Sequence, residues 1–242
     1  MRVVFTDTET PGFKTLFPVE LAALRFGGDD PRKLLGEGDE YVERFALGDV
    51  PMEWGAMAVH HILPIDLKGC REWNALRFEA DWIRGTDYLI GHNIDFDWEV
   101  IGKPNIKRIC TLALCRYYYP DLDAHKLSAM MYFLFGANED TRRRIKDAHS
   151  ALADVWNCRW VFDVIVNGFQ GLNTWEEVYQ KSEAGRIPLR MTFGKHGPKD
   201  GKKGMLISDM LVQDPGYVSW MKKSMTDMDP YLRKALDNPR EI

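Results

Sequence analysis

An apolar run that ends in two acids constrains the fold of this chain more than any other stretch. Residues 2–6 favour a strand, and Asp7 and Glu9 follow with one residue between them. Alternate side chains of an extended strand share a face, so both carboxylates point the same way from a strand that is expected to be buried. Two carboxylates this close repel each other, and burial without a partner is costly. The turn signal Pro11–Gly12 exposes the end of this strand, so the pair is either a solvated strand end or part of a metal site.

A third acid interrupts the apolar face of a helix predicted over 95–102. Asn93 is placed to cap that helix. Asp97 shares a face with the isoleucines three residues before it and four after it. Asp95 falls on the other side, which is expected to be wet. Asp97 is therefore interpreted as an inward carboxylate, with an exposed helix position as the alternative.

A fourth acid lies on the apolar stripe of a long helix predicted over 149–166. The stripe consists of Ala151, Asp154, Cys158, Val161 and Ile165. His149 stands five residues before Asp154 and does not share its face on a regular helix. We expect it at the helix start, where it can swing over a site, although a histidine in the core or on the surface is the alternative.

Four inward acids on one strand and two helices are hard to explain as structure alone, because each is costly to bury unpaired. Ligands that are all oxygen indicate a hard cation such as Mg²⁺ or Mn²⁺. The sequence shows no cluster of Cys and His suited to zinc.

These motifs together resemble a known family. Asp7 with Glu9, the segment 93–97, and His149 followed by Asp154 resemble the three exonuclease motifs of the DEDDh, or DnaQ-like, superfamily of 3′–5′ exonucleases. Residues 56–62 resemble the segment after the third strand in that group. Near the C-terminus, the segments 191–195 and 214–220 resemble the C-terminal module of the exodeoxyribonuclease X family. The resemblance spans nearly the whole chain.

The expected fold is α/β, with three strands first and then alternating helices and strands, which suggests a mixed sheet covered on both faces. The resemblance implies the ribonuclease H-like version, a mixed five-stranded sheet flanked by helices. Strands are predicted near 2–7, 19–27, 38–46, 87–91 and 106–109. Helices are predicted near 72–84, 95–102, 111–118, 126–135 and 149–166.

Three parts are expected along the chain: an exonuclease domain over 1–167, a connector over 168–185, and a small, mostly helical C-terminal module over 186–242. A Gly-Phe-Gln-Gly stretch marks the first boundary. The connector has a short helix at 175–182, and the module has a short strand at 190–193. Further helices are predicted near 206–212, 215–224 and 229–237. This module is interpreted either as a packing appendage or as a surface that binds DNA or a protein partner.

Composition is compatible with a nuclease but does not indicate one. The chain has 242 residues and a net charge of −4, and cations bound to the four acids would offset their charge. Basic runs at 142–146 and 195–203 are either solvated loops or contacts for nucleic acid.

We expect a cytoplasmic protein. No apolar stretch approaches the roughly 20 residues of a membrane span, and no signal peptide is readable before the first strand. The four cysteines form no CxxC motif and are expected to be reduced thiols: Cys70, Cys110, Cys115 and Cys158.

The resemblance implies phosphodiester hydrolysis at a 3′ end with two Mg²⁺ ions as cofactors, Mn²⁺ being able to substitute. Asp7 is expected to bridge the two cations, about 4 Å apart. Glu9 and Asp154 would complete the first cation site, and Asp97 the second, directly or through water. His149 would be the general base, since an imidazole with an unperturbed pKa of about 6.5 can accept a proton from water near neutral pH. The expected product is a nucleoside 5′-monophosphate.

The same resemblance implies contacts with the terminal nucleotide from Thr8, Thr10, Phe13, His60 and Asn93. Phe13 could stack on a base or wedge a duplex end, and a place in the core is the alternative. His61 is an equal candidate for the role of His60, and capping alone explains Asn93 equally well.

The expected partners are single-stranded DNA or the 3′ ends of duplex DNA, with no membrane. An RNA-trimming exonuclease would share every catalytic residue. A proofreading subunit associated with a polymerase is another alternative. A binding module that keeps the site only as a scaffold is the third, and the complete set of acids plus His149 argues against it.

Overall fold

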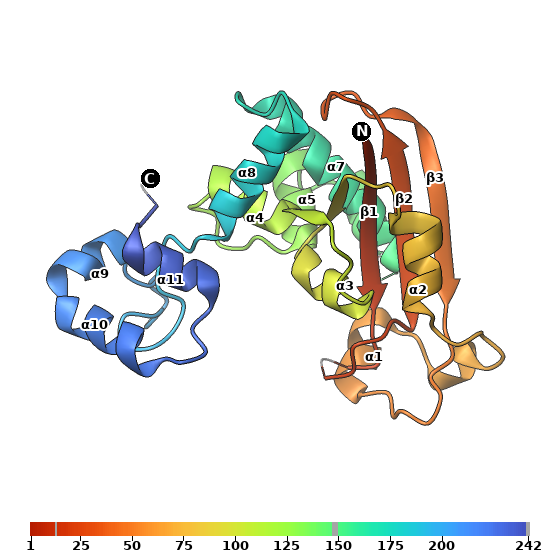
Figure 1. Cartoon of the computed structure of the whole chain (residues 1–242), viewed down its shortest axis with the longest axis horizontal. Coiled ribbons are helices and arrows are strands. Elements are labelled where there is room, and N and C mark those ends of the chain that lie inside the picture. Colours follow the sequence, from red (N-terminus) through yellow and green to blue (C-terminus); the bar gives the residue numbers. More distant parts are fainter. Residues whose placement is uncertain (13, 147–149, 241–242) are drawn as a thin grey trace. The chain divides into compact units, whose positions relative to one another are not determined.

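The computed structural model describes residues 1–12, 14–146 and 150–240, which fold into two compact units (Figure 1). The first unit extends from Met1 to Ser182, and the second begins at Glu183. Two residues proposed from the sequence, Phe13 and His149, lie outside the described residues.

A five-stranded sheet forms the centre of the first unit, in the order β3-β2-β1-β4-β5. Its strands are β1 (Arg2–Glu9), β2 (Glu20–Gly27), β3 (Leu35–Arg44), β4 (Tyr88–Gly91) and β5 (Lys107–Cys110). β1 pairs antiparallel with β2 and parallel with β4, so the sheet is mixed. The predicted fold class is confirmed, and all five strands lie close to where the sequence predicts them.

Helices cover both faces of this sheet because β1 and β2 are apolar on both sides. Phe5 and Leu24 pack toward α4 (Thr111–Tyr118), α5 (Leu127–Phe135) and α7 (Ala151–Gly168). Val4 and Leu21 face the opposite layer. That layer contains α2 (Ala75–Phe78), the π-helical turn η2 (Glu79–Ile83) and α3 (Ile94–Val100). Each of these buried side chains contributes about 1.5–3 kcal/mol of transfer free energy.

Three short elements are absent from the sequence-based prediction: α1 (Trp54–His60), the 3-10 turn η1 (Pro64–Leu67) and α6 (Glu139–Lys146). Each buries a single side chain, so none carries an apolar stripe that periodicity could detect. α6 contains the basic run that was interpreted either as a solvated loop or as a nucleic-acid contact. The loop interpretation is wrong, because Asn138 accepts from the Thr141 N–H at 2.9 Å, and acids in the first turn and bases in the last suit the helix dipole.

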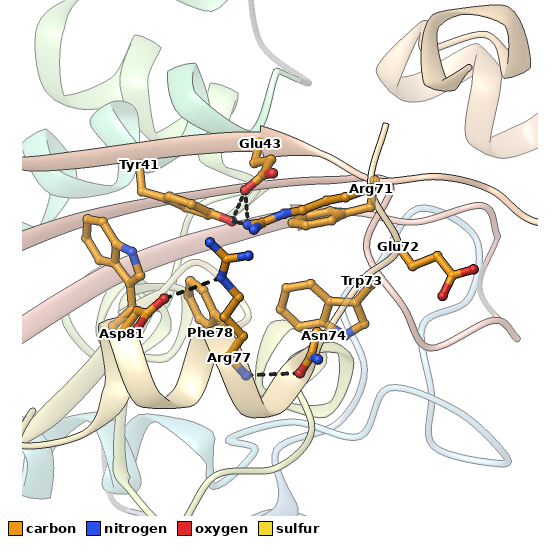
Figure 2. A pocket seen from close by; sticks show the side chains of 11 residues that line it. Tyr41, Glu43, Arg71, Glu72, Trp73, Asn74, Arg77, Phe78 and Asp81 are labelled. Atoms are coloured by element: carbon orange, nitrogen blue, oxygen red, sulfur yellow. Dashed lines mark hydrogen bonds and ion pairs between the residues drawn. The ribbon is translucent and has the colours of Figure 1, made fainter. Parts of the chain in front are cut away.

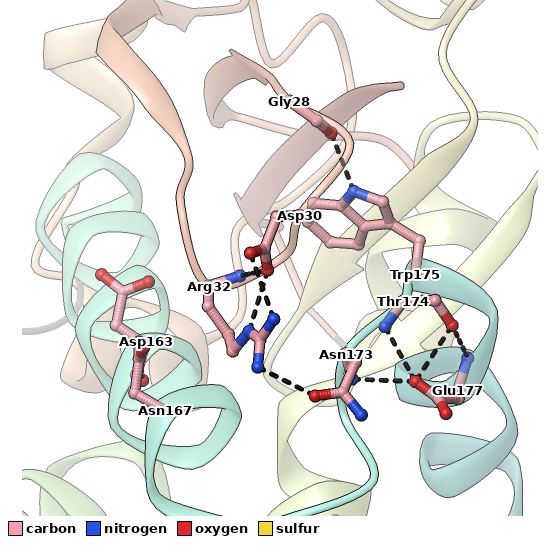
Figure 3. A network of polar contacts seen from close by, with 9 residues as sticks. All are labelled: Gly28, Asp30, Arg32, Asp163, Asn167, Asn173, Thr174, Trp175 and Glu177. Carbon is pink, nitrogen blue, oxygen red and sulfur yellow. Dashed lines mark hydrogen bonds and ion pairs between the residues drawn. The ribbon is translucent and has the colours of Figure 1, made fainter.

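Helix α8 (Trp175–Arg186) begins in a polar network that ties it to the sheet (Figure 3). Glu177 accepts hydrogen bonds from the Thr174 N–H at 2.8 Å and from its hydroxyl at 3.1 Å, while the same hydroxyl accepts from the Glu177 N–H at 3.2 Å. The Trp175 indole donates to the Gly28 carbonyl at 2.9 Å. Residues 168–182, expected as a connector, are therefore an ordered part of the first unit.

The second unit has its own core, supplied by α9 (Ile207–Gln213), α10 (Pro215–Ser224) and α11 (Pro230–Asp237). All three helices match their predicted ranges to within one residue. The short strand predicted at 190–193 is wrong, because only an isolated bridge joins Arg190 to Leu206. A core of this size buries few side chains, and those of Met191, Met210 and Met221 lie at its centre.

All four cysteines are free, in agreement with the predicted reduced thiols. Among the described residues, the helices are too short or too polar for any of them to cross a bilayer.

Candidate active site

Three carboxylates from two elements meet at the carboxyl end of β1. Asp7 and Glu9 lie on the strand face that Phe5 occupies, toward α7, and Asp154 lies in the first turn of α7. One oxygen from each carboxylate lies within 4.8 Å of one oxygen from each of the others. All three side chains are partly exposed. This three-carboxylate group therefore offers only hard oxygen ligands at an accessible point, the donor set that suits Mg²⁺ or Mn²⁺.

Asp97 approaches the same region from α3, on the opposite layer. Its side chain is 3% exposed, and it accepts a hydrogen bond from the Thr8 hydroxyl at 2.7 Å. Thr8 points to this layer because it alternates with Asp7 and Glu9 along β1. The inward orientation predicted for Asp97 is thus observed, and Asp95, predicted to be wet, is 43% exposed and paired with Arg108.

Electrostatic repulsion among these acids is strong. Burial raises the pKa of Asp7 well above its ordinary value, and the charges of Asp97, Asp154, Glu9 and Glu20 raise it further. Burial, followed by Asp154, raises the pKa of Glu9 to about 9. Burial also raises the pKa of Asp97 to about 7, although the hydrogen bond from Thr8 opposes that rise. A nearby cation would reverse these shifts.

Glu20 is a fifth acid that the sequence analysis did not single out. It pairs with Glu9 across the β1–β2 ladder and is 5% exposed. Its carboxylate accepts from Arg44 Nε at 2.7 Å and from the Ala151 N–H at 3.0 Å. The second bond supplies a cap to α7 that the Ser150 side chain does not provide. The signal that could have identified Glu20 is the pairing register of β1 and β2, which brings it opposite Glu9.

Three of the side chains proposed to contact substrate are hydrogen-bonded within the protein: Thr8, Thr10 and His60. The Thr8 hydroxyl donates to Asp97, and the Thr10 hydroxyl donates to the Gly12 carbonyl at 3.2 Å. The His60 ring is buried, and its Nδ1 accepts from the Ile62 N–H at 3.0 Å. The proton is therefore on Nε2, which lies 3.2 Å from the Thr10 carbonyl. These contacts support the turn after β1, while His61 beside it is exposed.

Asn93 stands at the N-cap position of α3, but its side chain makes no capping hydrogen bond. The predicted capping role is therefore wrong. Its backbone is left-handed, with φ of 80°, a conformation that Asn tolerates better than most residues. The Asn93 carbonyl accepts from the Phe96 N–H at 3.1 Å, so the backbone rather than the side chain starts the helix.

A separate hollow of about 470 Å³ lies between β3 and the α2–η2 segment (Figure 2). The Tyr41 hydroxyl donates to Glu43 at 2.7 Å, and Arg71 forms a close ion pair with Glu43. Arg77 lies 3.7 Å from Asp81. Aromatic side chains complete the walls of this pocket, which we call the aromatic pocket: Tyr41, Phe45, Trp73, Phe78 and Trp82.

Comparison with solved structures shows which proteins share this fold. Exonuclease X in complex with 5′-overhanging duplex DNA has a TM-score of 0.50 and 19% identity, and the match covers 73% of this chain and 99% of that one. A zinc-bound complex of Escherichia coli exonuclease I with single-stranded DNA has a TM-score of 0.53 and 20% identity, over 71% of this chain and 41% of that one. The first unit thus shares its fold with exonuclease X and exonuclease I.

Sequence comparison then gives a particular relative. Exodeoxyribonuclease 10 of Escherichia coli (strain K12) is 26% identical over 197 residues, which is 78% of this chain and 79% of that protein. The chain is homologous to this exodeoxyribonuclease, and the resemblance inferred from the motifs is confirmed. No family model matches the chain.

Proposed function

We propose that this protein is a metal-dependent 3′–5′ exonuclease that removes nucleoside 5′-monophosphates from the 3′ end of DNA. The observation that carries the proposal is the convergence of Asp7, Glu9 and Asp154 within 4.8 Å at the end of β1. The homology to an exodeoxyribonuclease supports the same chemistry and the choice of DNA.

The three-carboxylate group fits one hard cation, Mg²⁺ or Mn²⁺, and the proposal adds a second cation beside Asp97. Asp7, Glu9 and Asp154 would hold one, and Asp7 with Asp97 would hold the other. When bound, the cations supply positive charge that activates a water molecule and stabilises the phosphodiester oxygens as the bond breaks. Their own charge would also keep the acids ionised, against the shifts that raise the pKa of Glu9 to about 9.

The remaining residues of the site orient these ligands. Thr8 donates to Asp97 and so fixes one of its oxygens, which a buried carboxylate needs if it is to bind a cation in one geometry. Glu20 anchors the start of α7 through the Ala151 N–H, and Asp154 follows in the first turn. Both are positioning residues rather than catalytic ones.

His149 is the proposed general base, which accepts a proton from the attacking water. It lies outside the described residues, two positions before Ala151, whose N–H is bound to Glu20. The start of α7 is thereby tied to β2. A base within hydrogen-bond reach is worth about 10²–10⁴-fold in rate.

Digestion of 3′-labelled and 5′-labelled single strands and duplexes, of DNA and of RNA, tests the proposal in Mg²⁺ with and without a chelator. We expect the 3′ label to appear at once as a mononucleotide, the 5′ label to shift in a ladder, and the chelator to stop both. Exclusive loss of 5′ label, or full activity in chelator, would contradict the proposal. Preferential digestion of RNA would favour the RNA-trimming alternative.

Two acids on α3 provide a matched pair of variants. Asp97→Asn removes the charge of the buried acid that bonds Thr8, and we expect loss of nearly all activity. Asp95→Asn removes a partly exposed charge paired with Arg108, and we expect activity within about threefold of the unaltered protein. Equal effects in the two variants would show that Asp97 has no special role.

A further inference from the structure

A compact polar cluster in the second unit surrounds Asp214, at the start of α10. The Asp214 carboxylate accepts from Lys195 Nζ at 2.5 Å, from His196 Nε2 at 2.8 Å and from the Tyr217 N–H at 3.2 Å. The Lys195 ammonium lowers the pKa of Asp214 to about 2, so this carboxylate stays ionised and holds the cluster at any physiological pH.

Two aromatic rings beside this cluster stack on each other. Tyr217 and Trp220 are stacked with centroids 5.4 Å apart and planes 22° from parallel. The His196 ring packs against Tyr217 edge-on, with centroids 5.2 Å apart, and Lys195 Nζ lies 5.8 Å from the Tyr217 ring centroid. Trp220 is nevertheless 54% exposed. One indole face is therefore supported from within while much of the ring remains open to solvent.

The loop that presents Lys195 has a fixed path, because two glycines let backbone segments touch. A Cβ at Gly204 would lie 1.8 Å from the Met191 carbonyl oxygen, and one at Gly197 would lie 2.7 Å from the Phe193 backbone. The Met205 N–H donates to the His196 carbonyl at 2.9 Å across the same loop. The fixed path of this loop therefore keeps Lys195 close to the stacked rings of Tyr217 and Trp220.

The two units differ in net charge. From residue 183 onward the sequence has eleven Lys and Arg against eight Asp and Glu, a net charge of +3 in a chain whose total is −4. Exposed lysines of this unit lie in the loop that contains Lys195, on α10 and on α11: Lys195, Lys199, Lys202, Lys203, Lys223 and Lys234. Lys223 is three residues from Trp220, so the two side chains are neighbours on the helix surface.

We propose that Tyr217, Trp220, Lys195 and Lys223 form a surface that binds a single strand of DNA, with a base stacked on Trp220 and phosphates beside the lysines. Aromatic rings flanked by cations bind single strands in this way without sequence preference, and the net positive charge complements a polyanion. An apolar protein partner is a poorer fit because Ser219 and Lys223 flank the indole on the exposed side of α10. The choice of DNA rests on the proposed function; the surface itself does not.

The test is binding of a fluorescent DNA strand of about 30 nucleotides to the full-length protein in chelator, where no hydrolysis is expected, followed by anisotropy. Trp220→Ala is expected to weaken binding about tenfold, because one stacked base is lost. Trp220→Phe keeps a flat ring and should retain affinity within about threefold. Val212→Ala is the matched control, since Val212 is 81% exposed on α9 in the same unit, and it should bind like the unaltered protein.

A second variant tests the electrostatic part. Lys223→Gln should lower the slope of log K against log salt by about 0.7, the value for one phosphate contact on a single strand. An exposed position makes this substitution harmless to the fold, which thermal denaturation of each variant checks.

The proposal is overturned if Trp220→Ala binds like Val212→Ala, or if the unaltered protein binds no DNA in chelator. Tighter binding of an RNA strand that the same substitutions abolish would overturn the assignment to DNA. Hydrolysis is measured separately with Mg²⁺: its absence, with binding still lost in Trp220→Ala, would reject the exonuclease and leave this surface standing.

Discussion

Two acidic regions of the first unit differ in how their charge is balanced. In the aromatic pocket, Glu43 forms an ion pair with Arg71, and Asp81 lies beside Arg77. At the end of β1, burial and four neighbouring carboxylates all raise the pKa of Asp7. The protein's own arginines balance the acids of the pocket, whereas the three-carboxylate group would gain stability from a bound cation. Acids of the first kind hold structure together, and acids of the second kind indicate a metal-dependent site.

The sharpest test of this difference replaces one acid from each region with its amide. Asp7→Asn should reduce the exonuclease rate by on the order of 10⁴-fold, because the proposed bridging ligand loses its charge. Glu43→Gln should leave the rate within about threefold, since Glu43 contacts Arg71 and Tyr41 in the aromatic pocket. The rate of release of a 3′ label in Mg²⁺ measures both. Similar losses in the two variants would refute the distinction.

His149→Ala is expected to lower the rate by about 10²–10⁴-fold, the usual contribution of a general base. Cation binding should be unaffected, because the carboxylates carry it. Single-turnover rates across pH, together with a Mn²⁺ titration, separate the two effects. A variant that binds Mn²⁺ less tightly would assign His149 to metal binding instead.

Thr8→Val tests the orientation of Asp97 without altering any acid. Removal of the hydroxyl leaves a buried carboxylate without the 2.7 Å hydrogen bond that favours its ionised form. We expect the Mg²⁺ concentration for half-maximal rate to rise about tenfold, since such a bond is worth about 1.5–3 kcal/mol. Thr8→Ser keeps the hydroxyl and should restore the original value. If Thr8→Ser is as impaired as Thr8→Val, packing rather than the hydrogen bond is responsible.

Glu20 lies between the two kinds of acid, since Arg44 pairs with it while its charge still raises the pKa of Glu9. Glu20→Ala should lower the free energy of unfolding by about 2 kcal/mol, because the Ala151 N–H and the Arg44 guanidinium lose a partner. Glu20→Gln keeps an oxygen for the N–H and should cost less. Urea unfolding of both variants is the measurement. Equal stability of the alanine variant and the unaltered protein would remove Glu20 from this role.

The smallest expected effect is a change of stability with pH in chelator. The pKa of Glu9 rises from 4.5 to about 9, so between these values the folded chain keeps a proton that the unfolded chain has released. The contribution of Glu9 to the free energy of unfolding is therefore greatest below pH 4.5, and it is lost as the pH rises toward 9. We expect the melting temperature to fall on the order of 5 °C between pH 6 and pH 9, and Mg²⁺ to reverse the fall.

Glu9→Gln is the control for that measurement, because an amide does not titrate in this range. Its melting temperature should depend less on pH than that of the unaltered protein. A melting temperature that rises with pH in chelator would contradict the electrostatic account of the site.

Much of the fold was predictable because its elements carry strong periodic signals. The strand before Asp7 is apolar on both faces, and α7 has a stripe broken by a single acid. Both patterns are local, and they led to the carboxylates that the structure brings together. α1 and α6 were not predictable in this way, since each buries only one side chain and is held by contacts rather than by a stripe.

The parts of the site that sequence missed depend on pairing between distant residues. Glu20 becomes significant only when the register places it opposite Glu9 and the fold brings Ala151 to its carboxylate. Asn93 is a residue type that often caps helices, yet here its backbone is left-handed and its side chain makes no capping hydrogen bond. Residue type sets what a side chain can do, and tertiary contacts decide which of those possibilities is used.

The order of strands has a consequence for the timescale on which the site can open. β1 is the central strand of the sheet, hydrogen-bonded to β2 on one side and to β4 on the other, while β3 and β5 are the edge strands. Amide protons of a central strand exchange with solvent only when large parts of a domain unfold, whereas those of edge strands exchange through local opening. Deuterium uptake at the backbone amide of Asp7 should therefore report global unfolding. Smaller fluctuations of the protein should leave the spacing between the carboxylates of Asp7 and Glu9 unchanged.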